Sequence, residues 1–229
     1  MTILDARDIV KIFPEPVPFQ VLRGISLTIA RGEFVSIVGK SGCGKSTLLY
    51  VLSTLDTDYR GTLTIADTVV TGKDQDFLAH FRGEHIGFIF QFHFLLQEFT
   101  ILDNVLLPAL KLGKEPPDRV RDRAMGLLER MGIADYAHRP AKQLSGGQQQ
   151  RAAIARALIN QPALVIGDEP TGNLDSENTA AVLDLLSSIC RDMGQTVVIV
   201  THDREVAARS DRILTMADGR IIGEERRRP

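Results

Sequence analysis

Cysteine is scarce in this sequence, which holds only Cys43 and Cys190, far apart along the chain. Two such distant thiols provide neither a disulfide framework nor a cysteine cluster of the kind that binds zinc. The pattern suits a protein that works in a reducing cytoplasm.

Long hydrophobic runs and an excess of one charge are also missing. No apolar run approaches the ~18 residues of a membrane-spanning helix, and no signal-peptide pattern opens the sequence, so we expect any membrane role to act through a partner. The Lys and Arg residues number 27 and the Asp and Glu residues 29, which gives a formal net charge of −2. So small a net charge gives no electrostatic reason to expect nucleic-acid binding.

The 229 residues are otherwise ordinary for a globular protein, with 44% hydrophobic and 24% charged residues. This composition supports a substantial core and suits one large α/β domain or two small ones. Apolar patterns predict strands at 2–13, 21–29, 33–38, 61–70, 86–90, 163–167 and 195–200, and helices at 46–55, 74–82, 116–131, 149–160 and 179–190.

More specific predictions can be made for the segments near the two ends of the chain. The strand at 2–13 is predicted to lie at a sheet edge, and the prolines within 14–18 make the next segment a loop. Residues 211–222 are typical of a terminal hairpin, and Arg226, Arg227 and Arg228 of a solvated tail.

The segment Gly39–Thr47 fits the pattern G-x-x-x-x-G-K-[ST] between an expected strand and an expected helix. Glycines let the backbone N–H groups turn inward, and the helix N-terminus adds a positive partial charge. Such a loop holds nucleotide phosphates, with Lys45 reaching the β- and γ-phosphates and the Ser46 hydroxyl binding Mg²⁺. The alternative is a flexible turn, which the strand–loop–helix context disfavours.

Two residues in or before this loop have alternative interpretations. Cys43 either fills a small space or is a thiol made acidic by the loop N–H groups and Lys45, and protection from alkylation by ATP would distinguish the two. Phe13 either stacks on an adenine base or packs as a core residue at a strand end.

A second group of N–H donors is expected at Ser145-Gly146-Gly147-Gln148, where Ser145 stands at a helix start. An N-cap needs only the serine. The paired glycines therefore indicate that some other group approaches the backbone closely.

Two buried runs lead to polar residues. The run 163–167 ends at Asp168 and Glu169, and the run 195–200 leads to His202. Ligands bind beyond the carboxyl ends of the strands in an open parallel sheet. A carboxylate there can hold Mg²⁺, usually through water, and its neighbour can activate an attacking water. His202 is a candidate γ-phosphate contact, although a single histidine is more often structural.

The stretch Phe92–Val105 is rich in large apolar residues without a clean period. It is either a buried segment that packs a helical lobe or a docking surface for another protein.

These motifs, in this order, resemble the nucleotide-binding subunits of ABC transporters along essentially the whole chain. The matching pieces are the Walker A loop Gly39–Thr47, the Q-loop Gln91, the signature Leu144–Gln148, the Walker B pair Asp168-Glu169, the D-loop Asn173–Asp175 and the switch His202. Within that family, segments 87–96 and 168–175 are similar to the lipoprotein-releasing LolD type and its macrolide-exporter MacB relatives.

The resemblance implies an α/β fold of the P-loop NTPase class, with a central mostly parallel sheet, an N-terminal antiparallel β subdomain and an inserted α-helical subdomain. A single ABC ATPase domain would span 1–229, with its core at 1–90 and 162–229 and the helical subdomain at roughly 91–161.

The resemblance also implies roles for the site residues. ATP would be held by Phe13 at the base and, at the phosphates, by the loop residues Gly39, Lys40, Ser41, Gly42, Cys43, Gly44, Lys45, Ser46 and Thr47. Mg²⁺ would be surrounded by Ser46, Gln91 and Asp168. Glu169 would be the general base, and His202 would contact the γ-phosphate and position the attacking water. The sequence departs from the family at Phe13, commonly tyrosine, at Cys43, commonly serine, and at Gly167, commonly a larger residue.

The partners implied are a second copy of the chain and separate integral membrane permease subunits. The signature residues Ser145, Gly146, Gly147 and Gln148 would close over the ATP of the other copy, so that two ATP molecules lie in a homodimer. Permease subunits would dock near Phe92–Val105, at the cytoplasmic face of the inner membrane. ATP hydrolysis would then drive export or extraction of a lipoprotein, lipid or hydrophobic compound, with no nucleic-acid partner.

Three other functions are weighed against this one. ABC-type ATPases of DNA repair or translation typically carry coiled-coil or zinc-bearing insertions or two cassettes, and this chain has one cassette with no heptad run or cysteine cluster. A P-loop kinase or GTPase would not need the signature or the Asp168-Glu169 pair. A nucleotide-binding module that does not hydrolyse would not need the full catalytic set.

Overall fold

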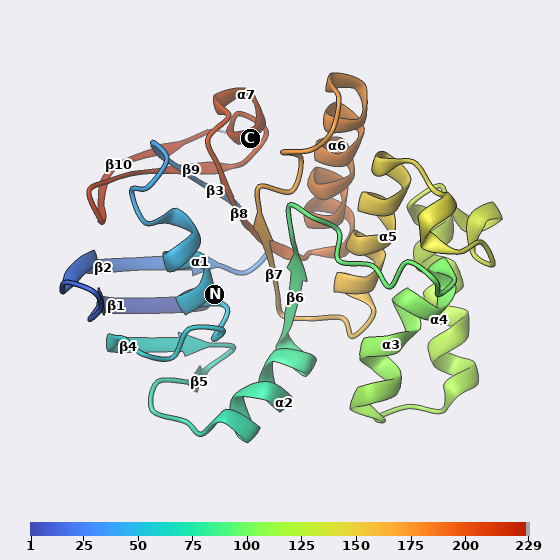
Figure 1. Cartoon of the computed structure of the whole chain (residues 1–229), viewed down its shortest axis with the longest axis horizontal. Helices are drawn as coiled ribbons and strands as arrows, with labels where there is room; N and C mark the ends of the chain where they lie inside the picture. Colours follow the sequence, from blue (N-terminus) through green and yellow to red (C-terminus); the bar gives the residue numbers. More distant parts are fainter. Residues whose placement is uncertain (228–229) are drawn as a thin grey trace.

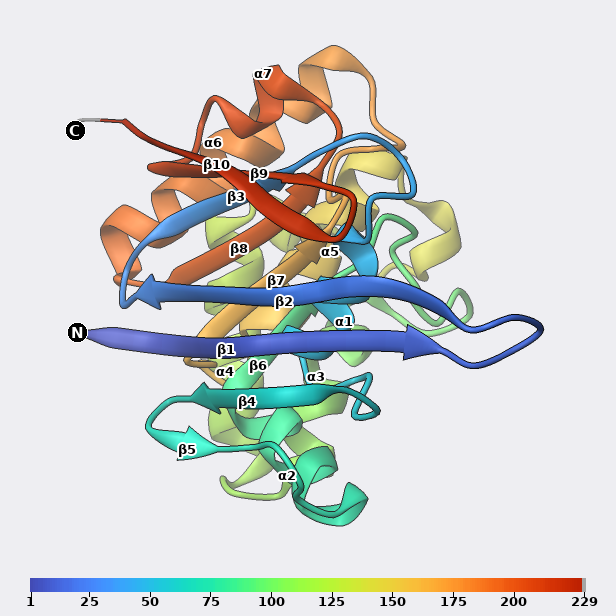
Figure 2. The ribbon, with the colours of Figure 1, turned by 90° about the vertical axis from the view of Figure 1, so that its left-hand side faces the viewer.

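The computed structural model describes residues 1–227, so the prediction for Arg228 lies outside the described residues. The chain builds two sheets, with an antiparallel sheet on one side of a larger, mostly parallel one (Figure 1, Figure 2). This arrangement agrees with the fold class expected from the sequence.

The antiparallel sheet has the strand order β2-β1-β4-β5. Its strands are β1 (Thr2–Phe13), β2 (Phe19–Ala30), β4 (Arg60–Ile65) and β5 (Thr68–Val69). The prediction that residues 2–13 form an edge strand is wrong, because Ala6 pairs with Leu27 of β2 on one side and with Leu63 of β4 on the other. The alternation of apolar and polar residues reports that one face of the strand is buried, and it carries no information about lateral neighbours.

The larger sheet has the order β10-β9-β3-β8-β7-β6, and only β10 runs antiparallel to its neighbour. Its strands are β3 (Phe34–Val38), β6 (Ile86–Ile89), β7 (Leu164–Asp168), β8 (Thr196–Thr201), β9 (Arg212–Ala217) and β10 (Arg220–Arg226). The terminal hairpin is confirmed. Arg226 is not part of a solvated tail, because it is the last residue of β10, and the N–H of Arg227 donates to the Asp211 carbonyl at 2.8 Å.

The helices are α1 (Lys45–Leu52), α2 (Gln75–His85), α3 (Ile101–Leu112), α4 (Pro117–Arg130), α5 (Gly146–Leu158), α6 (Ser176–Met193) and α7 (Arg204–Ala207), with 3₁₀ turns at Ala134–Tyr136 and Ala141–Gln143. The sequence did not predict α3, because the stretch Phe92–Val105 that contains its start has no clean apolar period and because the helix itself contains Pro108. A capping box between Thr100 and Asp103 starts it. Helix α6 begins before residue 179 because the Asp175 side chain accepts the N–H of Asn178 and caps it.

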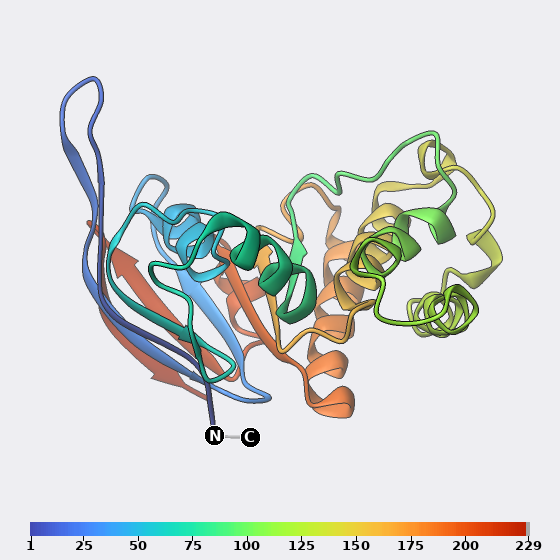
Figure 3. The ribbon, with the colours of Figure 1, turned by 90° about the horizontal axis from the view of Figure 1, so that it is seen from below.

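Each face of the larger sheet packs on its own core. Val35 and Ile37 of β3 pack with the antiparallel sheet, α1 and α2, whereas Phe34 and Val197 face the core that holds α3 to α6. Helices α3, α4 and α5 therefore lie on the side away from the antiparallel sheet (Figure 1, Figure 3). The division of the chain at about residues 91 and 161 stays a prediction.

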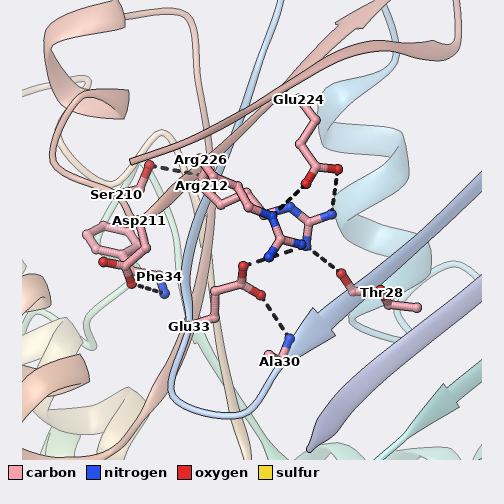
Figure 4. A network of polar contacts seen from close by, with 9 residues as sticks. All are labelled: Thr28, Ala30, Glu33, Phe34, Ser210, Asp211, Arg212, Glu224 and Arg226. Carbon is pink, nitrogen blue, oxygen red and sulfur yellow. Dashed lines mark hydrogen bonds and ion pairs between the residues drawn. The ribbon is translucent and has the colours of Figure 1, made fainter. Parts of the chain in front are cut away.

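Arg212 of β9 ties the two sheets together (Figure 4). Its side chain is only 7% exposed and donates to the Thr28 carbonyl of β2 at 2.8 Å. The same guanidinium contacts the carboxylates of Glu224 at 2.9 Å and Glu33 at 3.6 Å. Two carboxylates and a carbonyl thus contact a cation that would be unfavourable alone in this position, while its Nε is buried without a hydrogen-bond partner among the described residues.

Across residues 1–227, no helix combines the length and the apolar character that a membrane crossing requires.

Candidate functional site

The loop between β3 and α1 has the conformation that the glycine-rich pattern predicts. Gly42 and Gly44 have φ values of +78° and +101°, which favour glycine. A Cβ on Gly39 would lie 2.2 Å from the Met216 carbonyl oxygen, so β9 also requires a glycine there. The Lys45 ammonium donates to the carbonyls of Gly39 at 2.8 Å and Lys40 at 3.1 Å. These two hydrogen bonds therefore hold the Lys45 side chain against the start of the phosphate loop.

A cleft of about 340 Å³ opens over this loop. The ends of β7 and β8 supply its other wall, as expected for a site beyond the carboxyl ends of parallel strands. The cleft is lined by Val21, Ser41, Gly42, Gly44, Lys45, Ser46, Thr47, Glu169 and His202.

The Asp168 carboxylate is held from two sides by α1. Its Oδ1 accepts the Ser46 hydroxyl at 3.2 Å, and its Oδ2 accepts the Tyr50 hydroxyl at 3.3 Å. Burial raises the pKa of Asp168, and the hydrogen bonds from Ser46 and Tyr50 oppose that rise. Tyr50 was missed in the sequence, although it stands four residues after Ser46 and so shares its helix face.

Glu169 and His202 also meet at the cleft. Glu169 has a φ of +45°, and its N–H donates to the Val200 carbonyl at 3.0 Å. Its Oε1 accepts the backbone N–H of His202 at 3.0 Å and lies 2.8 Å from His202 Nδ1. Since an ionised carboxylate only accepts, Nδ1 carries the proton in this pair. The prediction that His202 contacts a γ-phosphate stays open, and the structure adds a contact with the glutamate.

Among the described residues, no hydrogen bond joins Gln91 to Ser46 or Asp168. Its carbonyl accepts the Asn173 side-chain amide at 3.1 Å. Its own Nε2 faces Gly172, where an added Cβ would lie 3.0 Å away. Two of the three predicted Mg²⁺ ligands therefore lie together, and the third lies against the loop that follows Glu169.

Phe13 ends β1 beside a hairpin that projects from the body of the molecule (Figure 3). Phe13 is 42% exposed, and the Lys11 ammonium lies 5.0 Å from the centroid of its ring. The alternative of a core phenylalanine is therefore wrong. Stacking on adenine stays a prediction, since Phe13 does not line the cleft over the phosphate loop.

Cys43 is half-buried, and its sulfur would lie 2.7 Å from a Cβ added at Gly39. This close fit favours the interpretation that the thiol fills a small space. The reactivity of Cys43 stays untested.

The signature segment begins α5 with a capping box. The N–H of Gln148 donates to Ser145 Oγ at 3.4 Å, and the N–H of Ser145 donates to Gln148 Oε1 at 3.0 Å. A Cβ on Gly147 would lie 2.1 Å from Asn178 Oδ1, so the group that approaches this glycine is a side chain of α6. At Gly146 the nearest atom to an added Cβ is Leu174 Cδ2, 3.8 Å away. None of the four signature residues lines the cleft over the phosphate loop.

A phosphate loop on β3, facing an aspartate–glutamate pair on β7 in a mostly parallel sheet, defines the class of P-loop NTPases. A family model described as ABC transporter matches residues 22–172. The chain belongs to the ABC transporter family and is an ATP-binding protein and ATPase of the LolD-like kind.

Two relatives in sequence come from lipoprotein-releasing systems. The lipoprotein-releasing system ATP-binding protein LolD of Aquifex aeolicus is 47% identical over 90% of this chain and 91% of its own length. The protein of the same name from Porphyromonas gingivalis is 47% identical over 97% of this chain and 100% of its own length.

The solved structures agree with the family and the fold. The dimeric structure of MJ0796, a bacterial ABC transporter cassette, superposes with a TM-score of 0.89 at 38% identity and covers 99% of both chains. A dimeric post-hydrolysis structure of the same cassette, bound to ADP and Pi, has a TM-score of 0.89 at 37% identity.

Proposed function

We propose that this chain is the ATP-hydrolysing subunit of a transporter that extracts or exports a lipoprotein, lipid or hydrophobic compound through separate membrane subunits. The observation that carries the proposal is the convergence of Lys45, Glu169 and His202 on one cleft, with Asp168 hydrogen-bonded to Ser46 at its edge. The lipoprotein-releasing systems named for the relatives supply the cargo class.

The chain's residues divide the chemistry among them. Lys45 and the loop N–H groups bind the phosphates of ATP, and Glu169 polarises the attacking water as general base. His202 donates from Nδ1 to the Glu169 carboxylate, so a hydrogen bond from its other ring nitrogen to the γ-phosphate requires a proton on that nitrogen as well.

Ser46 and Asp168 are the residues that would hold Mg²⁺. Their oxygens lie 3.2 Å apart at the mouth of the phosphate loop, and oxygen ligands are the ones that Mg²⁺ prefers. The ion, when bound, supplies neutralisation of the charge on the β- and γ-phosphates. Gln91 is a further ligand in this proposal if its side chain turns away from Gly172.

Two copies of the chain are proposed to enclose two ATP molecules. The segment Ser145–Gln148 starts a helix, where N–H donors favour an anion, and it lies outside the cleft of its own chain. A second copy would place this segment over the ATP held by Gly39–Thr47. The dimeric form of the MJ0796 cassette supports this arrangement.

The membrane subunits are proposed to dock near Phe92–Val105. The structure divides this stretch, because Ile101, Leu102 and Val105 are buried in α3 whereas Phe92 and Phe94 are more than 60% exposed. Leu96 and Phe99 are exposed beside them, so the start of the stretch offers the apolar contact area. Binding there would hold the chain at the cytoplasmic face of the inner membrane.

Replacing the proposed base tests this function. We expect Glu169→Gln to abolish ATP turnover while retaining ATP binding, so that Mg²⁺ and ATP convert the variant to a stable dimer in size-exclusion chromatography. Normal turnover in Glu169→Gln would contradict the role of Glu169. A variant that binds ATP and stays monomeric at every concentration would contradict the dimer.

A further inference from the structure

Gln150 is a fully buried polar residue on α5, two residues after the last residue of the signature segment Leu144–Gln148. Its Nε2 donates to the carbonyl of Pro170 at 2.6 Å. Pro170 directly follows Glu169 in the chain. One short hydrogen bond therefore joins the signature helix to the turn that presents the proposed base.

The tip of α5 also packs closely against the start of α6. Gly147 has Asn178 of α6 so close that an added Cβ would lie 2.1 Å from Oδ1. Asn178 in turn donates through Nδ2 to both oxygens of Asp175, at 3.0 and 2.9 Å. The tip of α5 and the segment from Glu169 to Asn178 thus form one interlocked unit.

The hydrogen bond that Gln150 donates to Pro170, rather than the packing of its side chain, accounts for a glutamine at this buried position. Its Oε1 is buried and has no hydrogen-bond partner among the described residues. An unsatisfied buried acceptor is unfavourable, so an apolar side chain of similar size would serve packing alone better.

We propose that Gln150 is a positioning residue that couples the two ATP sites of the dimer within each chain. The inference rests on the proposed function, because the signature tip of a chain faces the partner's ATP while Glu169 faces its own. When Ser145 engages the partner's ATP, the bond from Gln150 to Pro170 carries the position of α5 to the Glu169 turn. Hydrolysis at one site thus depends on occupancy of the other.

Two variants separate this role from packing. Gln150→Met keeps the volume and removes the amide, and Gln150→Glu keeps the shape and removes the donor. Gln195→Met is the matched control, because Gln195 Nε2 also donates to a proline carbonyl, that of Pro162 at 2.7 Å, at the start of β8. The measurements are ATP affinity, turnover and the Hill coefficient of turnover against ATP concentration.

We expect both Gln150 variants to lower kcat about tenfold, since a small misplacement of a catalytic group is enough for that loss. The Hill coefficient should fall towards one, while ATP affinity and ATP-induced dimerisation in the Glu169→Gln background stay within about twofold of the parent. Gln195→Met should keep both the turnover and the Hill coefficient of the parent.

Unchanged turnover and an unchanged Hill coefficient in both Gln150 variants would overturn the inference and leave the proposed function intact. A loss of kcat that only matches a loss of ATP affinity would also overturn it. Absence of ATP turnover in the parent chain would instead overturn the proposed function.

Discussion

Glu169 Oε1 receives two N–H groups from a single residue, the backbone N–H of His202 at 3.0 Å and the ring Nδ1 at 2.8 Å. The two residues directly follow the neighbouring strands β7 and β8, which lie side by side in the larger sheet. The glutamate side chain is therefore fixed at the wall of the cleft, and the histidine ring is fixed with it. This pairing makes His202 a residue that positions the proposed base.

Removing the ring should uncouple catalysis from binding. We expect His202→Ala to lower kcat about 10²-fold or more, because the Glu169 carboxylate loses one of its two donors. ATP affinity should stay within about threefold of the parent, since phosphate binding rests on Lys45 and the loop N–H groups. His138→Ala, at an exposed histidine, is the control. Equal turnover in His202→Ala and the parent would show that the Glu169 contact does not act in catalysis.

The hydroxyl of Tyr50 should affect the metal rather than the nucleotide. Tyr50→Phe keeps the ring, which lies 6.4 Å from that of Phe88, and removes the bond to Asp168 Oδ2. We expect the half-saturating Mg²⁺ concentration to rise about fivefold, which corresponds to one lost hydrogen bond. ATP binding without Mg²⁺ should not change.

Tyr59→Phe provides the comparison for Tyr50→Phe, because the Tyr59 hydroxyl bonds to the Thr71 hydroxyl at 2.9 Å and makes no hydrogen bond to Asp168. Superimposable Mg²⁺ titrations, by turnover and by Mn²⁺ binding, for Tyr50→Phe and the parent would contradict the role of Tyr50.

The contact between the sheets should depend on Arg212. We expect Arg212→Met to lower the free energy of unfolding by about 1–3 kcal/mol, because the bonds of the buried guanidinium to the Thr28 carbonyl, Glu33 and Glu224 are lost. Glu33 keeps the Ala30 N–H as a donor, and Glu224 keeps Arg226. Arg226→Met removes the other partner of Glu224. Because the Arg226 side chain is exposed, this change should alter the free energy of unfolding by less than about 1 kcal/mol. Urea unfolding measures both, and similar small losses in the two variants would contradict the role of Arg212.

The sequence predicted which residues form the site better than it predicted the contacts between residues that are distant in the chain. The phosphate loop, Asp168 and Glu169 follow from fixed patterns next to apolar strands, and the structure places the loop and Glu169 on one cleft. The neighbours of β1 and the bond from Gln150 to Pro170 join residues distant in sequence, which periodicity does not report. The paired glycines did predict a close approach, but Asn178 could not be identified as the approaching group without the fold.

Helix α3 shows a second kind of limit. Most of its residues are apolar on both the buried and the exposed side, and it contains Pro108, which is unfavourable inside a helix. The exposed Phe92 and Phe94 precede this helix in an irregular segment. Because large apolar residues occur both in cores and in docking surfaces, the sequence could not separate the buried part of the stretch from the exposed part.

The structure of the Glu169→Gln chain with Mg²⁺ and ATP would test the central claim most directly. Our account predicts a dimer in which each ATP lies between the Gly39–Thr47 loop of one copy and Ser145 of the other. A dimer saturated with ATP in which Ser145 lies remote from both nucleotides would contradict it.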